Sequence, residues 1–479
     1  MQLSKEHGYF APQARMRIRK LSLRKTSLLA TILCTLGAGV CYTLSERIES
    51  SRRAHAVNET QGATPITPTV LVDSNPTVLL NNNATIRFRD NLSPSHKYVT
   101  TFTIAGFTNQ VIATVNLIYL AILTGRTPII PPLLPDHFGN LDTVAPIAFS
   151  DIFDIPRLTN ELNIPVIEWH EVKIPTSPEI ESIGCWNTGS VMAATGNVPP
   201  SSDHPHVSYT PVPSTFTLSR GAIANDIMFS AWALASLAYP KSRQLQLNSK
   251  RPHILPDHSG RKIEPDDQLL CFDALYYVGL IDPSPAYDFF AEYSPFWSRV
   301  GTHLHWKSSL TDLATQYLRR HFGVADDDLP PPPFISVHIR RTDFKQACSA
   351  ELEPEKCFAP IKAYERRVSE IKQSLQDRPD GIEVTRVLVT SDEDDPEWWK
   401  QVAALGPEWS WIDHTAEKTA ETHGQWYPLI LDAVIQSMGI GFVGTQQSTM
   451  SQIAWRRVED WQNGLGVEVR WGRPGADDH

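Results

Sequence analysis

Three polar clusters in this 479-residue chain each follow a stretch with the pattern of a β-strand. The first contains Gly106 and Asn109, the second runs over His338–Asp343, and the third runs over Gly444–Ser451. In open α/β sheets, ligands bind beyond the carboxyl ends of the strands, where loops and helix N-termini supply hydrogen-bond donors. Taken together, the clusters predict a site for a phosphorylated ligand.

The second cluster carries the clearest chemistry, because Arg340 and Arg341 end an apolar strand expected over Phe334–Ile339. Arginine presents a planar fork of donors that matches a phosphate bidentately, so Arg340 is a natural diphosphate ligand. The structural alternative is a solvated strand end, in which the arginines pair with Asp343. His338 lies inside the strand, where a lone histidine is more often a hydrogen-bonded core residue.

The other two clusters lie at expected strand-to-helix turns. Gly106 permits a tight turn, and Asn109 lies at the positive end of the helix that follows. Thr445, Ser448 and Thr449 place hydroxyls around the start of another helix, where backbone N–H groups also favour an anion. The same residues would otherwise serve as ordinary turn and cap residues.

Strands alternate with helices in two separate blocks, which predicts two α/β lobes. The first block has the pattern of a strand, a helix and a strand over His96–Ile104, Asn109–Leu123 and Thr127–Ile130. The second block has expected strands at Phe334–Ile339, Arg386–Thr390 and Ile440–Gly444, and helices at Ile361–Leu375, Tyr427–Met438 and Ser448–Arg457.

We place the two lobes at 96–329 and 330–479, with the proline run Pro330–Pro333 as a hinge. Residues 140–265 contain many prolines and little periodicity, so long loops over the first lobe are expected there.

The N-terminus has the pattern of a membrane anchor. Residues 1–25 form a cytoplasmic tail with seven Lys and Arg and one acid, and Thr26–Leu44 follows without a charge. As a helix rising ~1.5 Å per residue, the uncharged stretch spans most of a hydrocarbon core of about 30 Å. The basic flank predicts a single-pass, type II protein with its bulk in the lumen of the Golgi or endoplasmic reticulum. A cleaved signal peptide is the alternative.

Residues 45–95 are rich in Thr, Asn, Ser and Pro, which is typical of a solvated stalk. N-glycosylation sequons begin at Asn58, Asn83 and Asn91 within it.

Four of the six cysteines lie beyond the anchor, and an even number in an oxidising compartment permits two disulfides. Cys348 and Cys357 are close enough to close a loop, which leaves Cys185 and Cys271 for the second. There is no CxxC or HExxH pattern for zinc. The net charge is −10 and the positive charge gathers at the N-terminus, so the folded part does not have the composition of a nucleic-acid binder.

The segment His338–Asp343 resembles the most diagnostic motif of the GDP-fucose-dependent fucosyltransferases, which include protein O-fucosyltransferases and α1,6-fucosyltransferases. Gly106–Gln110 is similar to the N-terminal motif of this group, and Asp432–Thr449 resembles its C-terminal donor-binding motif. Val387–Asp395 is similar to a family strand that ends in acids. The resemblance extends over about 97–460.

The resemblance implies an α/β, GT-B-like fold, in which two Rossmann-like lobes face a cleft and the C-terminal lobe holds most of GDP-fucose. His338 and Asp432 would contact guanine and ribose, and Arg340 would bind the diphosphate and stabilise departing GDP. No metal or other cofactor is expected. The other implied donor-site residues are Gly106, Asn109, Arg341, Asp343, Thr445, Ser448 and Thr449.

The resemblance leaves the catalytic base unassigned. In α1,6-type enzymes an acid shortly after the arginine motif is the proposed base, and the corresponding place here is near Cys348, with Glu351 and Glu353 further on. Some protein O-fucosyltransferases have an acid beside the N-terminal motif, where this chain has Asn109 and Gln110. An inactive lumenal protein that binds a nucleotide sugar or glycan is therefore one alternative.

A metal-dependent GT-A glycosyltransferase is another alternative, because the acidic run Asp392–Asp395 follows a strand and would suit Mg²⁺ or Mn²⁺. It does not account for Arg340, and sensitivity to EDTA separates the two. The acceptor, a protein or a glycan, is not predicted by these motifs.

Overall fold

The computed structural model describes residues 79–479, except 104, 137, 140, 189–205, 219–227, 281–287, 326–328 and 350. They belong to one compact unit, Val72–His479. The expected tail at 1–25, the anchor at 26–44 and the sequon at Asn58 lie outside the described residues. Among the residues described, one helix, α4 (Phe107–Thr124), is long and apolar enough to cross a membrane, and 67% of that stretch is buried inside the protein.

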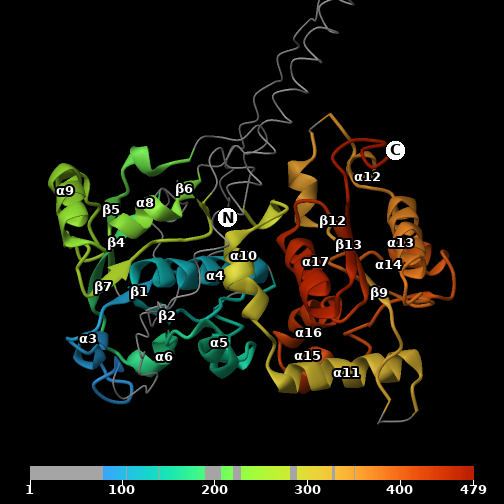
Figure 1. Cartoon of the computed structure of the whole chain (residues 1–479), viewed down its shortest axis with the longest axis horizontal. Coiled ribbons are helices and arrows are strands. Elements are labelled where there is room, and N and C mark those ends of the chain that lie inside the picture. The colour runs from blue at the N-terminus through green and yellow to red at the C-terminus, as the bar shows by residue number, and fades with distance from the viewer. Residues whose placement is uncertain are drawn as a thin grey trace, which may run out of the picture. The chain divides into compact units, whose positions relative to one another are not determined.

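The first sheet has four parallel strands in the order β3-β2-β1-β7. Figure 1 labels three of them, β1, β2 and β7. The strands are β1 (Tyr98–Thr100), β2 (Thr127–Ile130), β3 (Ile167–Glu168) and β7 (Leu269–Cys271). The expected strand–helix–strand unit is confirmed, because β1 and β2 flank α4 in sequence and pair in parallel. Helix α4 ends at Gly125, whose φ of 61° is the left-handed conformation that terminates helices.

Further elements surround this sheet. The helices are α3 (Phe88–Asn91), α5 (Ile155–Leu162), α6 (Trp169–Val172), α8 (Ala231–Ser236), α9 (Pro240–Lys250) and α10 (Pro295–Arg299). Two small parallel sheets pair β4 (Ser182–Asn187) with β5 (His206–Pro211) and β6 (Phe229–Ser230) with β8 (Val278–Gly279). The prediction of long loops over 140–265 is thus wrong in part, since β3 completes the first sheet and the Cys185–Cys271 disulfide joins β4 to β7.

The folded part begins earlier than expected. Leu79, Leu80, Phe88 and Leu92 are buried in one cluster with Tyr98 of β1. Residues 79–95 are therefore not part of a solvated stalk, because their apolar side chains pack against the first sheet.

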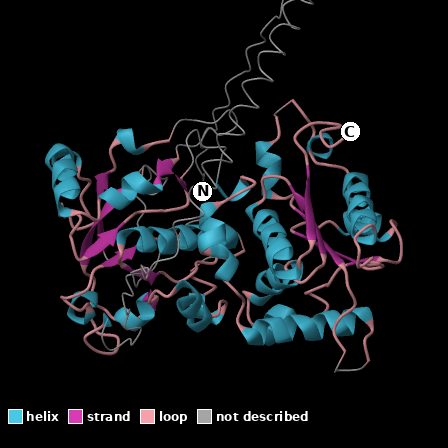
Figure 2. Cartoon of the chain, in the orientation of Figure 1, coloured by secondary structure: helices cyan, strands magenta, loops and turns pink. Residues whose placement is uncertain are grey.

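The second sheet has five parallel strands in the order β11-β10-β9-β12-β13. They are β9 (Ile335–Ile339), β10 (Val387–Ser391), β11 (Trp409–Ser410), β12 (Gly441–Thr445) and β13 (Leu465–Val469). The helices are α11 (Ser308–Phe322), α12 (Pro354–Cys357), α13 (Ile361–Gln376), α14 (Pro396–Ala403), α15 (Thr419–His423), α16 (Tyr427–Gln436) and α17 (Thr449–Gln462). Helices cover both faces of this sheet (Figure 2), and the strands and helices expected in the second block are present.

Successive residues of β9 face opposite sides of the sheet, as the twofold period of a strand requires. Ile335, Val337 and Ile339 pack in one cluster with α13 and α14. Ser336 instead donates to the Gln436 carbonyl of α16 at 2.8 Å.

Helix α11 packs with the second sheet, although the expected boundary at 329/330 assigns it to the first lobe. Its Tyr317 hydroxyl lies 3.0 Å from the Thr419 hydroxyl, and His321 Nε2 lies 2.8 Å from Ser410 Oγ. The change from one sheet to the other therefore precedes α11, and the Pro330–Pro333 run does not mark it.

Candidate active site

The clusters at the ends of β9, β10 and β12 form one site. Strand β9 pairs in parallel with β10 on one side and with β12 on the other, so their carboxyl ends meet at the same edge. The backbone N–H of Arg340 donates to Thr445 Oγ1 at 2.9 Å, and that of Arg341 donates to Asp392 Oδ1 at 2.8 Å. This edge therefore brings together residues more than 100 positions apart in the chain.

The Arg340 side chain is held by two carboxylates. Its Nε and Nη2 donate to Asp343 Oδ1 and Oδ2 at 2.8 and 2.9 Å, and Nη1 lies 3.2 Å from Asp392 Oδ2. The strand-end ion pair weighed as the alternative is thus present. Because a guanidinium carries five N–H groups and these contacts use three, the pair orients Arg340 without occupying all its donors.

Arg341 points to the opposite face of the sheet. Its Nε donates to Glu393 Oε2 at 2.5 Å, and its guanidinium lies 4.6 Å from the Phe358 ring and 5.4 Å from the Trp398 ring. Neighbouring residues at a strand end diverge, so Arg341 lies away from Arg340, and its expected support of the phosphates stays a prediction.

His338 is a buried residue directly before the arginine pair, with 3% exposure. Its Nδ1 lies 2.8 Å from Ser451 Oγ, which also accepts the backbone N–H of Thr445 at 3.0 Å. Burial lowers the pKa of His338 to about 4, and the charge of Arg340 acts in the same direction. The imidazole is therefore neutral at physiological pH and ties β9 to the first turn of α17.

The hydroxyls of Thr445 and Ser448 have partners within the protein. Thr445 Oγ1 donates to the His338 carbonyl at 3.1 Å and lies 2.7 Å from the buried Tyr364 hydroxyl. Ser448 caps α17, since its Oγ accepts the Ser451 N–H at 3.4 Å. Both side chains are almost fully buried, so they hold the backbone of the site in place and do not present free hydroxyls to a ligand.

The first cluster meets the third through Asn109. Thr449 Oγ1 donates to Asn109 Oδ1 at 2.7 Å, which joins the start of α17 to the start of α4. Gly106 is the N-cap residue of α4. Gln110 has a structural role, because its side chain binds the backbone N–H and carbonyl of Leu134 at 2.8 Å.

Asp432 lines a separate cavity of about 560 Å³ beyond β10 and β11. Trp399, Trp411 and His414 line it as well, and His414 Nε2 lies 3.0 Å from Asp432 Oδ1. Burial alone would lower the pKa of His414, but the hydrogen bond and charge of Asp432 outweigh it and raise this pKa. Indole rings beside a carboxylate suit a nucleobase with N–H donors. His338, which was expected at the nucleoside together with Asp432, is not among the described residues that line this cavity.

The motifs did not predict the role of Asp392. Its carboxylate accepts the N–H groups of Arg341 and Thr342 and pairs with Arg340, so it orders the whole turn after β9. The signal available in the sequence was an acid directly after a buried strand. Two neighbouring acids also have protein partners, since Glu393 binds Arg341 and Asp395 caps α14.

A disulfide closes the loop after the arginine motif. Cys348 pairs with Cys357, as expected, so Cys348 carries no free thiol that could act as a base. Glu353 forms an ion pair with Lys356 at 2.8 Å. Besides Glu353, the carboxylates that the structure describes between the two cysteines are Glu351 and Glu355, and both are exposed.

The two sequons inside the described residues differ sharply. Asn83 is exposed. Asn91 is 0% exposed, and its Nδ2 donates to the carbonyls of Glu171 and Val172 at 3.1 and 3.0 Å. The prediction of glycosylation at Asn91 is therefore wrong for the folded protein, because the reactive nitrogen is buried.

An arginine, a helix start and carboxylates at the carboxyl edge of a parallel sheet define the site of an α/β enzyme that binds a phosphorylated ligand. The sequence profile of the GDP-fucose protein O-fucosyltransferases matches residues 98–459. The chain belongs to this family, and the predicted identity as a GDP-fucose-dependent fucosyltransferase is confirmed.

Solved structures of fucosyltransferases are similar to this chain over most of their length. POFUT1 in complex with GDP-fucose is 16% identical and has a TM-score of 0.48, with 80% of this chain and 99% of that chain covered. NodZ α1,6-fucosyltransferase soaked with GDP-fucose is 13% identical with a TM-score of 0.34, over 76% and 93%. A NodZ structure from Bradyrhizobium is 12% identical with a TM-score of 0.35, over 75% and 92%. No curated protein matches the sequence in a direct comparison.

Proposed function

We propose that this fucosyltransferase holds the diphosphate of GDP-fucose between Arg340 and the start of α17, and transfers fucose to a hydroxyl of a protein acceptor. The position of Arg340 carries the proposal, since it lies where β9, β10 and β12 end together. As the bond from fucose C1 to the phosphate oxygen breaks, negative charge develops on GDP. A preoriented guanidinium and a helix N-terminus stabilise that charge without rearrangement.

Other residues have supporting roles in this proposal. The cavity beside Asp432 would take guanine, whose N–H groups can donate to a carboxylate. Asn109, bonded to Thr449, borders the diphosphate from the α4 side. Two separate parallel sheets, of four and five strands, support a GT-B arrangement.

We also propose that transfer needs no metal ion, because Asp392, Glu393 and Asp395 already bind protein groups. Activity should persist in EDTA. Loss of activity that Mn²⁺ restores would favour the GT-A alternative, in which the run from Asp392 to Asp395 binds the donor.

Incubation of the protein with labelled GDP-fucose and a panel of folded protein domains and glycans tests the acceptor. Transfer to protein hydroxyls is expected, and the Arg340→Ala variant should lose it. Transfer to glycans alone would contradict the protein acceptor. Binding of GDP without transfer to any acceptor would point to the inactive nucleotide-sugar-binding protein.

Membrane anchoring in the Golgi or endoplasmic reticulum belongs to the proposal as well. The uncharged stretch Thr26–Leu44 supports it, and so do the two disulfides, which form in oxidising compartments. Protection of the protein from protease in sealed microsomes, and its retention in membranes after alkaline extraction, test this topology.

A further inference from the structure

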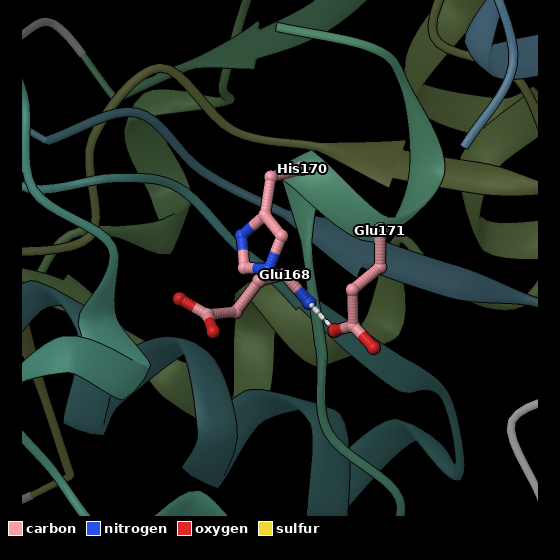
Figure 3. A group of neighbouring side chains, drawn as sticks. All are labelled: Glu168, His170 and Glu171. Carbon is pink, nitrogen blue, oxygen red and sulfur yellow. Dashed lines mark hydrogen bonds between the residues drawn. The ribbon is translucent and has the colours of Figure 1, made fainter. Parts of the chain in front are cut away.

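We propose that Glu168, His170 and Glu171 bind a divalent metal ion at the end of β3, on residues that the donor site does not use. One ligand atom from each side chain lies within 4.8 Å of the other two. Figure 3 shows the imidazole and both carboxylates beside the start of α6. Glu168 ends β3 of the first sheet and the other two ligands lie in α6, whereas Arg340 and Asp392 follow strands of the second sheet.

Local structure explains why the two carboxylates are close. They form a capping box at α6. The Glu171 carboxylate accepts the Glu168 N–H at 2.7 Å (Figure 3), and the Glu168 carboxylate accepts the backbone N–H of Glu171. Capping does not involve His170, whose imidazole has no hydrogen-bond partner among the described residues. The capping box therefore preorganises two ligands and leaves the third free.

The charges favour a cation at this place. Glu168 is only 4% exposed, and its carboxylate also accepts the Ser150 N–H at 3.2 Å. Across the described ranges, no Lys, Arg or His lies within 4.0 Å of either carboxylate; the ammonium of Lys173 donates instead to the Glu179 carbonyl at 2.6 Å. The two carboxylates and the imidazole together offer the negative charge and the lone pairs that a divalent cation binds.

Glu168 and His170 line a cavity of about 540 Å³ together with Trp169 and Lys173, whereas Glu171 is not among its described lining residues. The cavity gives an ion and its waters both room and access. One imidazole nitrogen with two carboxylates favours Zn²⁺ or Mn²⁺, because Ca²⁺ and Mg²⁺ prefer ligand sets of oxygen alone. Three protein ligands leave positions open for water or for an oxygen atom of a molecule in the cavity.

Calorimetric titration of the EDTA-treated, dialysed full-length protein with ZnCl₂ tests the proposal. One ion is expected per chain, and His170→Ala and Glu171→Gln should each weaken its affinity by more than about tenfold. Glu171→Gln is informative because glutamine also accepts the Glu168 N–H, so the capping box and the fold are retained. His253→Ala, which removes another exposed histidine, should leave the affinity unchanged.

Absence of Zn²⁺ binding by the wild-type protein would overturn the proposal, and so would equal affinity in the His170 and Glu171 variants. The latter result would place the ion elsewhere, for example at the acids after β10. Binding of Ca²⁺ more tightly than Zn²⁺ would also contradict the assignment of His170 as a ligand. Titration with GDP in EDTA monitors the donor site separately, and its affinity should be the same in all variants.

Discussion

The substitution Arg340→Lys distinguishes a diphosphate ligand from a simple strand-end ion pair. Lysine keeps the positive charge but loses the planar fork, so it cannot present parallel donors to a phosphate. If Arg340 stabilises departing GDP, the loss of one preoriented donor raises the barrier by roughly 3 to 4 kcal/mol, or about 10²- to 10³-fold in kcat. If Arg340 only pairs with Asp343, catalysis should be almost unchanged.

The effect on stability should be small in either case. The Arg340 and Asp343 side chains are 22% and 40% exposed, and such partly solvated pairs contribute at most about 1 kcal/mol. Arg341→Lys is the matched comparison, because that side chain is 17% exposed and packs against Phe358 and Trp398. It should lower the melting temperature more than Arg340→Lys does, by a free energy of about 1 kcal/mol, and lower kcat less.

The assay measures kcat with labelled GDP-fucose and the thermal midpoint for Arg340→Lys, Arg341→Lys and Asp343→Asn. A large loss of kcat in Arg340→Lys with a nearly unchanged midpoint is expected. A fully active Arg340→Lys enzyme would refute the assignment, whatever its thermal midpoint, because Arg340 would then not stabilise departing GDP.

Three further predictions concern other parts of the molecule. Burial raises the pKa of Glu468 to about 7, against the opposing charge of Arg456. Ionisation of Glu468 therefore does not lower the free energy of unfolding below pH 4.5, and lowers it fully above pH 7. Glu468→Gln should therefore stabilise the protein by about 3 kcal/mol at pH 8 and hardly at pH 4.5 in thermal melts, and equal effects at both would contradict this. Asp392→Asn should lower kcat by about tenfold or more, because asparagine loses the charge-assisted bonds to the turn after β9. The variant should not need Mn²⁺, and rescue of the wild-type enzyme in EDTA by Mn²⁺ would contradict this role of Asp392. Asn83→Gln should remove one N-glycan, seen as a gel shift in protein secreted or retained in the lumen, whereas Asn91→Gln should not.

Local sequence was sufficient to predict most elements around the site. The continuous apolar run before Arg340 predicted β9, and Ser448 was correctly expected at the start of α17. Such features depend on the backbone and on neighbouring residues alone, because strand period and helix capping act over a few positions. The motifs around Arg340 and Asn109 were also sufficient for the family, which the profile match confirms.

The partners of these residues were decided by tertiary structure. Only the pairing of β9 with β10 and β12 brings Asp392 and Thr445 to the backbone of the arginine motif. In the same way, the burial of Asn91 depends on the carbonyls at the end of α6, 80 residues or more away. Apolar and polar periodicity reveals that a strand is buried, but not which strand lies beside it, since many pairings bury the same side chains.

The sequence by itself therefore determined most strands and helices around the donor site, the arginine at the strand end and the family. Tertiary structure decided that Arg340 and Arg341 serve opposite faces, that α11 packs with the second sheet, and that Asp392 holds the turn. The physical reason is that a strand or cap is stabilised by contacts within a few residues. The geometry of a site instead follows from packing and hydrogen bonds between segments whose separation in the chain carries no local signal.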